Sequence, residues 1–383
     1  MIHILHLCSY YTGSTVYRDL IRQLSQDDRV GEQFVFSPIR KESQKEANQI
    51  RSRHVTIQYV YCLNLLTRLS FFLKQIRLWR AFRASPEASN ALMKASVIHA
   101  HTLYADGVLA YLFYRLYEKP YVVTVRGTDV NLGDRFFVIW RPLAKAILRN
   151  ANRVFFVSPA HLTLAKRRYP KLLAHAAVVP NGLDDFWLEN AVSRKNSNSN
   201  NDRVRGLFIG SINRNKNLKS ALEAFHRAAK GRPYSFEVIG GSYKEFVARF
   251  GALRGGILDN VEFRGLITDK AVIKHSLENA NIFVMPSFSE TFGLVYLEAI
   301  SQATPVVYSL GQGIDGYFRP GETGFPCDPG DVSSITSAIE KTLEKFPAGL
   351  RYPDVDKNPA RHFSWSHAAD TILRSGYQAD VIN

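Results

Sequence analysis

Two glutamates, Glu290 and Glu298, stand eight residues apart in a segment suited to binding an anion. An apolar, strand-like run ends at Pro286, because proline cannot donate a backbone hydrogen bond to a sheet. Thr291 is a plausible N-cap for a following helix, and Gly293 allows a ligand to approach the backbone closely. The segment therefore predicts a loop that opens into a helix, with its first amides and dipole directed at a negative group.

This junction suits a phosphorylated sugar. The amides of Phe292, Gly293 and Leu294 are expected to point at the phosphate. Glu290 on the loop is expected to reach sugar hydroxyls, and Glu298, about two turns into the helix, to reach a ribose. The alternative is a surface helix with two solvated glutamates, which leaves the turn at Phe292 and Gly293 unexplained.

Length and composition favour two globular domains. A chain of 383 residues is too long for one ordinary core, and 46% hydrophobic residues is normal for a globular protein. No uninterrupted apolar run approaches about 18 residues, so no transmembrane helix is predicted. The first residues resemble a buried strand and not a signal peptide. Three distant cysteines, Cys8, Cys62 and Cys327, fit a reducing cytoplasm and no disulfide or metal pattern.

Positive charge is concentrated in the first half. Residues 1–200 hold 28 Lys and Arg against 14 Asp and Glu, which accounts for nearly all of the net charge of +15. General solubility does not require such segregation. The asymmetry indicates an anionic partner for the first half, such as membrane lipid, nucleic acid or a phosphorylated acceptor.

Short apolar runs alternate with helical patterns in both halves, which predicts an α/β fold with two doubly wound parallel sheets. Expected strands lie at 2–7, 33–37, 96–99, 121–125, 153–157 and 176–179, then at 207–210, 235–239, 261–263, 282–285 and 305–308. Expected helices include 16–24, 108–117, 218–229, 333–345 and one within 363–377. The polar stretch 193–202 reads as a flexible insertion near a domain boundary.

The segment from Pro286 to Glu298, followed by Thr304-Pro305-Val306-Val307, resembles the signature of retaining glycosyltransferases of family 4, of the bacterial surface-polysaccharide type. The resemblance implies the GT-B fold, in which two Rossmann-like domains face a central cleft. It implies an acceptor domain over residues 1–190, with a C-terminal helix at about 363–383 packing back onto it. Residues 203–362 would form the nucleotide-sugar donor domain.

The resemblance also implies donor-binding residues outside the glutamate segment. Lys216 matches a lysine that binds the diphosphate, whereas Ser211 stands where the family usually has an arginine. Arg214 is a candidate replacement, or else an exposed loop arginine. Leu266, after Phe263-Arg-Gly265, matches the base-binding edge. Gly13, followed by Ser14 where the family has a second glycine, matches a turn near the transferred sugar.

In the first half, two further motifs match the family. Arg126 stands where many members have a histidine, and since arginine is permanently cationic it is no general base. We expect Asp129 to orient Arg126 or an acceptor hydroxyl. His101 is expected at the acceptor, or else as a packed strand-end histidine. We expect His99 and His101 to point away from each other, so no metal is predicted.

Residues 65–83 form an apolar helical stripe flanked by basic residues. The stripe consists of Leu65, Leu69, Phe72, Ile76 and Trp79. Such a helix is typical of one that rests on anionic lipid, and equally of one that covers the core with snorkelling arginines.

Together these features imply a metal-independent retaining transferase that moves a hexose from a UDP- or GDP-linked sugar to a saccharide acceptor, and that needs no cofactor. Glu290, Lys216, Arg126 and Asp129 would be its catalytic residues. The acceptor is expected to be lipid-linked, at the cytoplasmic face of the membrane, in lipopolysaccharide or capsule assembly. The alternative is a basic nucleic-acid- or membrane-binding protein on an inactive scaffold. No nucleic-acid recognition motif is present, so no nucleic-acid partner is expected.

Overall fold

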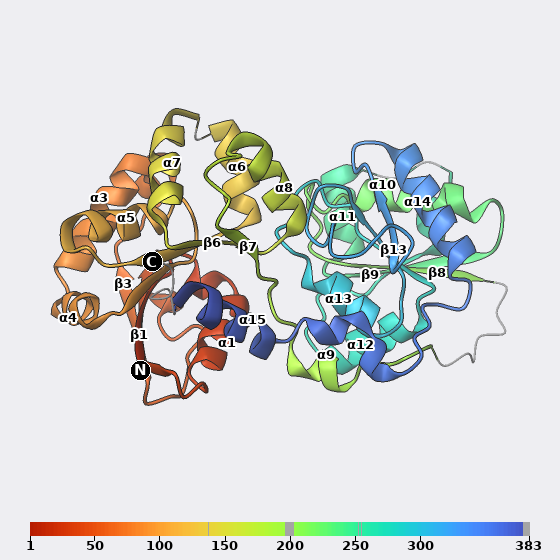
Figure 1. Ribbon diagram of the computed structural model, residues 1–383. Coiled ribbons are helices and arrows are strands. Elements are labelled where there is room, and N and C mark those ends of the chain that lie inside the picture. Colours follow the sequence, from red (N-terminus) through yellow and green to blue (C-terminus); the bar gives the residue numbers. More distant parts are fainter. Residues whose placement is uncertain (137, 196–202, 252, 254, 378–383) are drawn as a thin grey trace. The chain divides into compact units, whose positions relative to one another are not determined.

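The computed structural model describes residues 1–136, 138–195, 203–251, 253 and 255–377, except the side chains of residues 68, 132–136 and 138. The described chain forms two compact units (Figure 1). The first contains Met1–Val157, His161–Gly182 and the described residues from Trp365 onward. The second contains Ser158–Ala160 and Leu183–Ser364. The expected boundary at residue 190 thus falls at Gly182 in the structure.

The first unit is built on a seven-stranded sheet in the order β3-β2-β1-β4-β5-β6-β7, with every pair parallel. Its strands are β1 (Ile2–Leu7), β2 (Val30–Ile39), β3 (Val55–Tyr61), β4 (Val97–Ala100), β5 (Tyr121–Val125), β6 (Arg153–Phe156) and β7 (Ala176–Val178). The order reverses between β1 and β4. In such sheets, ligands bind beyond the carboxyl ends of the strands at this reversal.

Helices cover both faces of this sheet. One apolar cluster joins the sheet to α3 (Phe71–Arg83), α4 (Pro86–Lys94), α5 (Gly107–Tyr117) and α7 (Arg141–Asn150). Another joins it to α1 (Thr15–Leu24), α15 (Trp365–Ile372) and the turn η7 (Leu373–Tyr377). The remaining helices of the unit are α2 (Leu65–Leu69), α6 (Gly127–Phe136) and α8 (Pro159–Arg168), which begins in the second unit.

The second unit has a six-stranded sheet in the order β10-β9-β8-β11-β12-β13, also all parallel. Its strands are β8 (Val204–Ile209), β9 (Tyr234–Ile239), β10 (Val261–Phe263), β11 (Ile282–Val284), β12 (Val306–Ser309) and β13 (Gly324–Cys327). Its helices are α9 (Asp185–Glu189), α10 (Leu218–Ala229), α11 (Tyr243–Phe250), α12 (Lys270–Asn279), α13 (Leu294–Ser301) and α14 (Val332–Lys345). The reversal lies between β8 and β11.

The predicted α/β class with two doubly wound parallel sheets is confirmed. Two edge strands were not predicted. After its first residue β3 is exposed or only partly buried, so it lacks the buried apolar run of a central strand. β13 contains Pro326, which an edge strand tolerates because one of its sides pairs with no other strand. The insertion predicted at 193–202 lies mostly outside the described residues.

The expected single helix over residues 65–83 was wrong. The chain breaks at Ser70, whose extended backbone and side chain cap the start of α3. Trp79 packs against Phe113, so it belongs to the core and not to an exposed stripe. Leu69 and Phe72 remain exposed on either side of the break.

The end of the described chain packs on the first unit, as the resemblance implied. In Figure 1 the blue α15 lies beside the red α1, and both belong to one apolar cluster. Trp365 begins this segment directly against Gly182, where an added Cβ would lie 2.4 Å from the indole. Among the residues that the structure describes, we find no helix with the length and apolar character needed to cross a bilayer.

Candidate active site

In the second unit, an ion pair joins the two loops that leave the sheet at its reversal. Lys216, in the loop after β8, places its Nζ 2.5 Å from Oε2 of Glu290, in the loop after β11. Asn213 Oδ1 accepts a hydrogen bond from the backbone N–H of Lys216, which fixes the lysine loop. Two residues predicted to bind the donor therefore meet at the carboxyl end of the sheet, where ligands bind.

The glutamate loop is held by the glycine-rich turn that follows β12. Glu290 donates its backbone N–H to Gln312 Oε1, and its carbonyl accepts from the N–H of Gly313. Gly313 has a φ of +54° and approaches Glu290 so closely that a Cβ would lie 2.9 Å from Glu290 Cγ. This turn thus sets the direction of the Glu290 side chain.

The helix after Glu290 begins without the predicted side-chain cap. Gly293, and not Thr291, is the N-cap, with a φ of +80° that a residue with a Cβ rarely adopts. An added Cβ at Gly293 would also lie 2.5 Å from the Tyr296 ring. The glycine is therefore needed for packing inside the protein, apart from any space that it leaves for a ligand. Leu294 begins α13, and its amide belongs to the first turn, where N–H groups lack helical partners.

Phe292 serves the core as well as the loop. Its side chain is buried against Tyr317 and Phe363. The turn at Phe292 and Gly293 is therefore explained by packing and backbone geometry together. Only the backbone amides in this turn stay available for the role that the sequence predicted.

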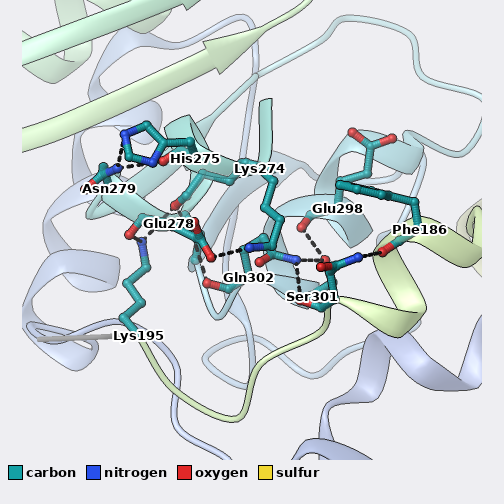
Figure 2. A network of polar contacts seen from close by, with 12 residues as sticks. Phe186, Lys195, Lys274, His275, Glu278, Asn279, Glu298, Ser301 and Gln302 are labelled. Atoms are coloured by element: carbon teal, nitrogen blue, oxygen red, sulfur yellow. Dashed lines mark hydrogen bonds and ion pairs between the residues drawn. The ribbon is translucent and has the colours of Figure 1, made fainter. Parts of the chain in front are cut away.

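Glu298 lies on α13 in a half-buried position. Burial raises the pKa of its carboxyl to about 7, an effect that Lys270 opposes and Asp184 increases. Lys270 itself is paired with Asp184 at 2.7 Å. Figure 2 shows Glu298 joined to its neighbours through its backbone carbonyl, which accepts from Ser301 Oγ. The carboxylate is thus left out of this network and is suited to take a ligand hydroxyl.

The same network fixes α12, which packs on α13. Lys195 donates to the carbonyls of Leu277, Glu278 and Ala280 at the end of α12 (Figure 2). A cation at a helix C-terminus interacts favourably with the dipole. This lysine was not singled out from the sequence, because its partners are backbone groups far along the chain.

Three other residues predicted to bind the donor make no described contact with the Lys216–Glu290 ion pair. Ser211 is exposed and accepts from the side chain of Asn213. Arg214 is also exposed, and no ion pair of its guanidinium is found among the described residues. Leu266 is 81% exposed, which leaves it open to a flat ligand. Whether Arg214 replaces the expected arginine stays a prediction.

In the first unit, Arg126 is buried at the carboxyl end of β5. Its Nε donates to the carbonyl of His101 at 3.2 Å, and its Nη1 to Asn181 Oδ1 at 3.4 Å. The guanidinium also lies 4.4 Å from the centre of the Tyr17 ring. It is therefore fixed, and a cation held this way is suited to stabilise a negative group.

Asp129 orients Arg126 through the backbone and not through the guanidinium. Its carboxylate accepts from the backbone N–H groups of Arg126, Leu103 and Tyr104 at 3.0, 3.1 and 3.4 Å. Burial raises the pKa of Asp129, and these hydrogen bonds oppose the rise. Asp129 thus shapes the loops around Arg126 through their backbone N–H groups.

The expectation that His99 and His101 point apart was wrong. Residues two apart on a strand share a face, and here the rings stack with centroids 4.1 Å apart. His6 on the neighbouring β1 joins them, with its Nδ1 3.0 Å from His101 Nε2. Burial lowers the pKa of all three, to about 4 for His6 and well below the usual value for the others.

Hydrogen bonds occupy part of this histidine cluster, whereas the buried Nδ1 of His101 has no hydrogen-bond partner among the described residues. One nitrogen from each ring lies within 4.8 Å of the others, a spacing that an ion could use. Both nitrogens of His99 are, however, bonded to Tyr377 and Thr124, at 2.5 and 2.7 Å. A metal bound through His99 would have to displace one of these partners. That no metal is needed stays a prediction.

Gly13 lies at the same end of the first sheet. It closes a short turn, its N–H bonding the carbonyl of Tyr10, and a Cβ added there would meet nothing within 4 Å. Ser14 is the N-cap of α1, although its side chain makes no cap hydrogen bond. There is open space beside Gly13, and a sugar near this turn stays a prediction.

Two family models divide the chain between them. One described as Glycosyltransferase Family 4 matches residues 13–185, and one described as Glycosyl transferases group 1 matches residues 189–350. This chain is a glycosyltransferase of GT-B type. Its α-maltose-1-phosphate synthase relative from Mycobacterium tuberculosis (CDC 1551) is 28% identical over 319 residues, covering 74% of this glycosyltransferase and 79% of the relative.

Solved structures share the fold of the glycosyltransferase. Sucrose-phosphate synthase (tll1590) from Thermosynechococcus elongatus superimposes with a TM-score of 0.76 at 20% identity, covering 98% of both chains. The lipopolysaccharide outer core galactosyltransferase WaaB, in its apo form, gives 0.71 at 14% identity, covering 97% of this chain and 98% of that one. At these identities the likeness concerns the fold.

Proposed function

We propose that this glycosyltransferase moves a hexose from a UDP- or GDP-linked sugar to a saccharide acceptor with retention of configuration. The ion pair of Lys216 with Glu290, beside the first amides of α13, carries the proposal. A lysine and free helix amides are suited to a diphosphate, and a neighbouring carboxylate to sugar hydroxyls. Glu298, whose carboxylate makes no contact within the network of Figure 2, would hold the ribose.

The reaction proceeds by attack on the same face of the sugar as the leaving group. The bond from the anomeric carbon to the diphosphate oxygen breaks as the acceptor oxygen bonds to that carbon. The acceptor proton passes to the departing phosphate. Lys216 and the amides of Phe292 to Leu294 stabilise the charge that develops on the diphosphate, which is why no metal is required. Glu290 orients the sugar.

The first unit holds the acceptor. Arg126, fixed by His101 and Asn181, supplies positive charge to the acceptor. His101 is fully buried, as in the packed alternative, and acts on the acceptor through its carbonyl contact with Arg126. Asp129 fixes the backbone around Arg126 and so acts on position rather than on the substrate. Gly13 leaves room for the transferred sugar.

The acceptor is lipid-linked, and the enzyme rests on the inner face of the cytoplasmic membrane. Leu65, Leu66, Leu69 and Phe72, which we call the α2 patch, are between 56% and 78% exposed. The first 200 residues carry nearly all of the net charge of +15, which favours an anionic surface. The pathway would be the assembly of a surface polysaccharide, such as lipopolysaccharide or capsule.

A donor screen tests the proposal. Thermal unfolding is followed with UDP-glucose, UDP-galactose and GDP-mannose in the presence of EDTA, for wild type and Glu298→Ala. One donor should raise the Tm of the wild type and not of the variant, because binding to the folded state stabilises it. Slow hydrolysis of the donor should release a sugar with the same anomeric configuration as the donor. NMR has to record this product early, before the free sugar changes its configuration in water. If no donor stabilises a folded sample and random DNA binds instead, the inactive basic scaffold replaces this proposal.

A further inference from the structure

Lys74 is a buried cation at the ligand-binding end of the first sheet. It lies in the first turn of α3 and is 8% exposed. Its Nζ lies 5.2 Å from the centre of the Tyr10 ring, and Tyr10 follows the end of β1. Lys74 is thus directed toward the same edge as Arg126 and His101, although no sequence motif drew attention to it.

No partner in the described part of the chain neutralises this lysine. Its ammonium makes no hydrogen bond or ion pair there, and the nearby carboxylates are engaged elsewhere. Asp106 accepts from the backbone N–H of Ser9 at 2.9 Å and from the hydroxyl of Thr102 at 2.8 Å. Asp129 accepts from three backbone amides, as described above. Both act on Lys74 only from beyond ion-pair distance.

The position of Lys74 is unfavourable without a ligand. A cation in the first turn of a helix opposes the dipole, and a buried charge without a direct partner loses its hydration. Burial accordingly lowers the pKa of Lys74, and the charge of Arg40 adds to this effect while Asp106 opposes it. Arg40 directly follows β2, and its guanidinium has no hydrogen-bond or ion-pair partner among the described residues. Since β1 and β2 are neighbours, Tyr10 and Arg40 leave the sheet at the same end, and Gln44 joins their two loops through hydrogen bonds with Thr12 Oγ1 and the backbone N–H of Arg40. Two cations without ion-pair partners in the described chain therefore lie at neighbouring strand ends.

We propose that Lys74 and Arg40 bind a phosphoryl group of the acceptor, with Tyr10 covering one side of it. This rests on the proposed function, since it names the acceptor class as a sugar or lipid-linked sugar that carries phosphate. A phosphoryl group supplies the negative charge that the site lacks and accepts hydrogen bonds from both side chains.

Trace acetylation with mass spectrometry tests the site on the full chain without any donor. Inorganic phosphate should protect Lys74 in a saturable manner, whereas potassium chloride at equal ionic strength should not. Lys166, which is exposed on α8, serves as the internal control and should react equally throughout. Arg40→Gln should raise the phosphate concentration for half-protection about tenfold, because one charged hydrogen bond is lost. Absence of phosphate-specific protection would overturn the proposal.

Further arms separate this site from the donor site and from a lipid surface. Protection should persist in Lys216→Met, which removes the candidate diphosphate lysine. Glucose 1-phosphate should protect at least as well as phosphate. Protection by phosphatidylglycerol vesicles alone, with none by soluble phosphates, would overturn the acceptor site in favour of membrane contact. If transfer fails but phosphate protects Lys74, the proposed function falls and the anion site stands.

Discussion

Lys216 Nζ and Glu290 Oε2 lie 2.5 Å apart, so the two side chains proposed to hold opposite ends of the donor neutralise each other when no donor is bound. A diphosphate must take over the lysine before the glutamate is free to turn to the sugar. Donor binding is therefore coupled to the release of Glu290 from Lys216. A substitution of either residue is expected to change how the other binds the donor.

Removing Lys216 should weaken donor binding more than it weakens the fold. Lys216→Met is expected to raise the Kd for the preferred nucleotide sugar by about 10- to 100-fold, the value of one charged hydrogen bond to phosphate. Calorimetric titration measures this, with Lys219→Met, an exposed residue of α10, as the matched control. Equal affinities for wild type and Lys216→Met would remove the lysine from the donor site.

The carboxyl of Glu298 should make both stability and donor affinity depend on pH. Its pKa of about 7 in the folded protein exceeds the usual 4.5, so the folded state binds more protons between these values. Stability should consequently fall as pH rises through this window and level off above it. Affinity for the donor should rise as pH increases from 4.5 to about 7, because the ionised carboxylate accepts hydrogen bonds from the ribose hydroxyls.

Glu298→Gln is the control for both effects. The variant should show a flatter dependence of Tm on pH between about 4.5 and 7, together with weak, pH-independent donor binding. Thermal unfolding and calorimetric titration at several pH values check the two parts separately. A variant that keeps the wild-type pH dependence would assign it to another group.

Tyr377 should stabilise the first unit through His99. Its hydroxyl lies 2.5 Å from His99 Nδ1 in a buried position, so Tyr377→Phe leaves a polar nitrogen without its partner. We expect a loss of about 1–3 kcal/mol of unfolding free energy, measured in urea. Tyr308→Phe is the matched control, since the buried Tyr308 hydroxyl has no hydrogen-bond partner among the described residues. A similar loss in both variants would show that the His99 contact is not responsible.

The α2 patch should bind anionic membranes. Leu69→Gln combined with Phe72→Gln is expected to reduce cosedimentation with phosphatidylglycerol vesicles at least about tenfold, because each side chain would bury apolar surface in lipid. Leu116→Gln, with 57% exposure on α5, controls for loss of an exposed leucine elsewhere. Unchanged cosedimentation of the double variant would show that lipid binding, if present, uses another surface.

The fold could be predicted because buried parallel strands are short apolar runs. The boundaries of β1, β5 and β10 agree with the prediction, whereas edge strands such as β13 carry a weaker signal. The glutamate segment could also be predicted, because Glu290, Gly293 and Glu298 are close in sequence. The role of Gly293 as N-cap could not be predicted, because it depends on close packing against Tyr296 and the helix propensities of single residues do not describe packing.

What the sequence could not provide were contacts between distant segments. His6 and His101 are 95 residues apart, and His99 and Tyr377 are 278 apart, so no spacing pattern joins them. Lys74 resembled one more basic residue of an amphipathic helix. Only the burial of its side chain, and the engagement of Asp106 and Asp129 with other groups, distinguish it from its neighbours.

The packing of α15 and η7 on the first unit has a consequence for biosynthesis. During translation, the strands of this unit are complete by Val178, but one face of the sheet lacks Trp365, Ile372 and Leu373 until the second unit has been made. The second unit can gather its core during that interval. The first unit is thus expected to complete its core after the second unit, with apolar surface open to chaperones in the meantime.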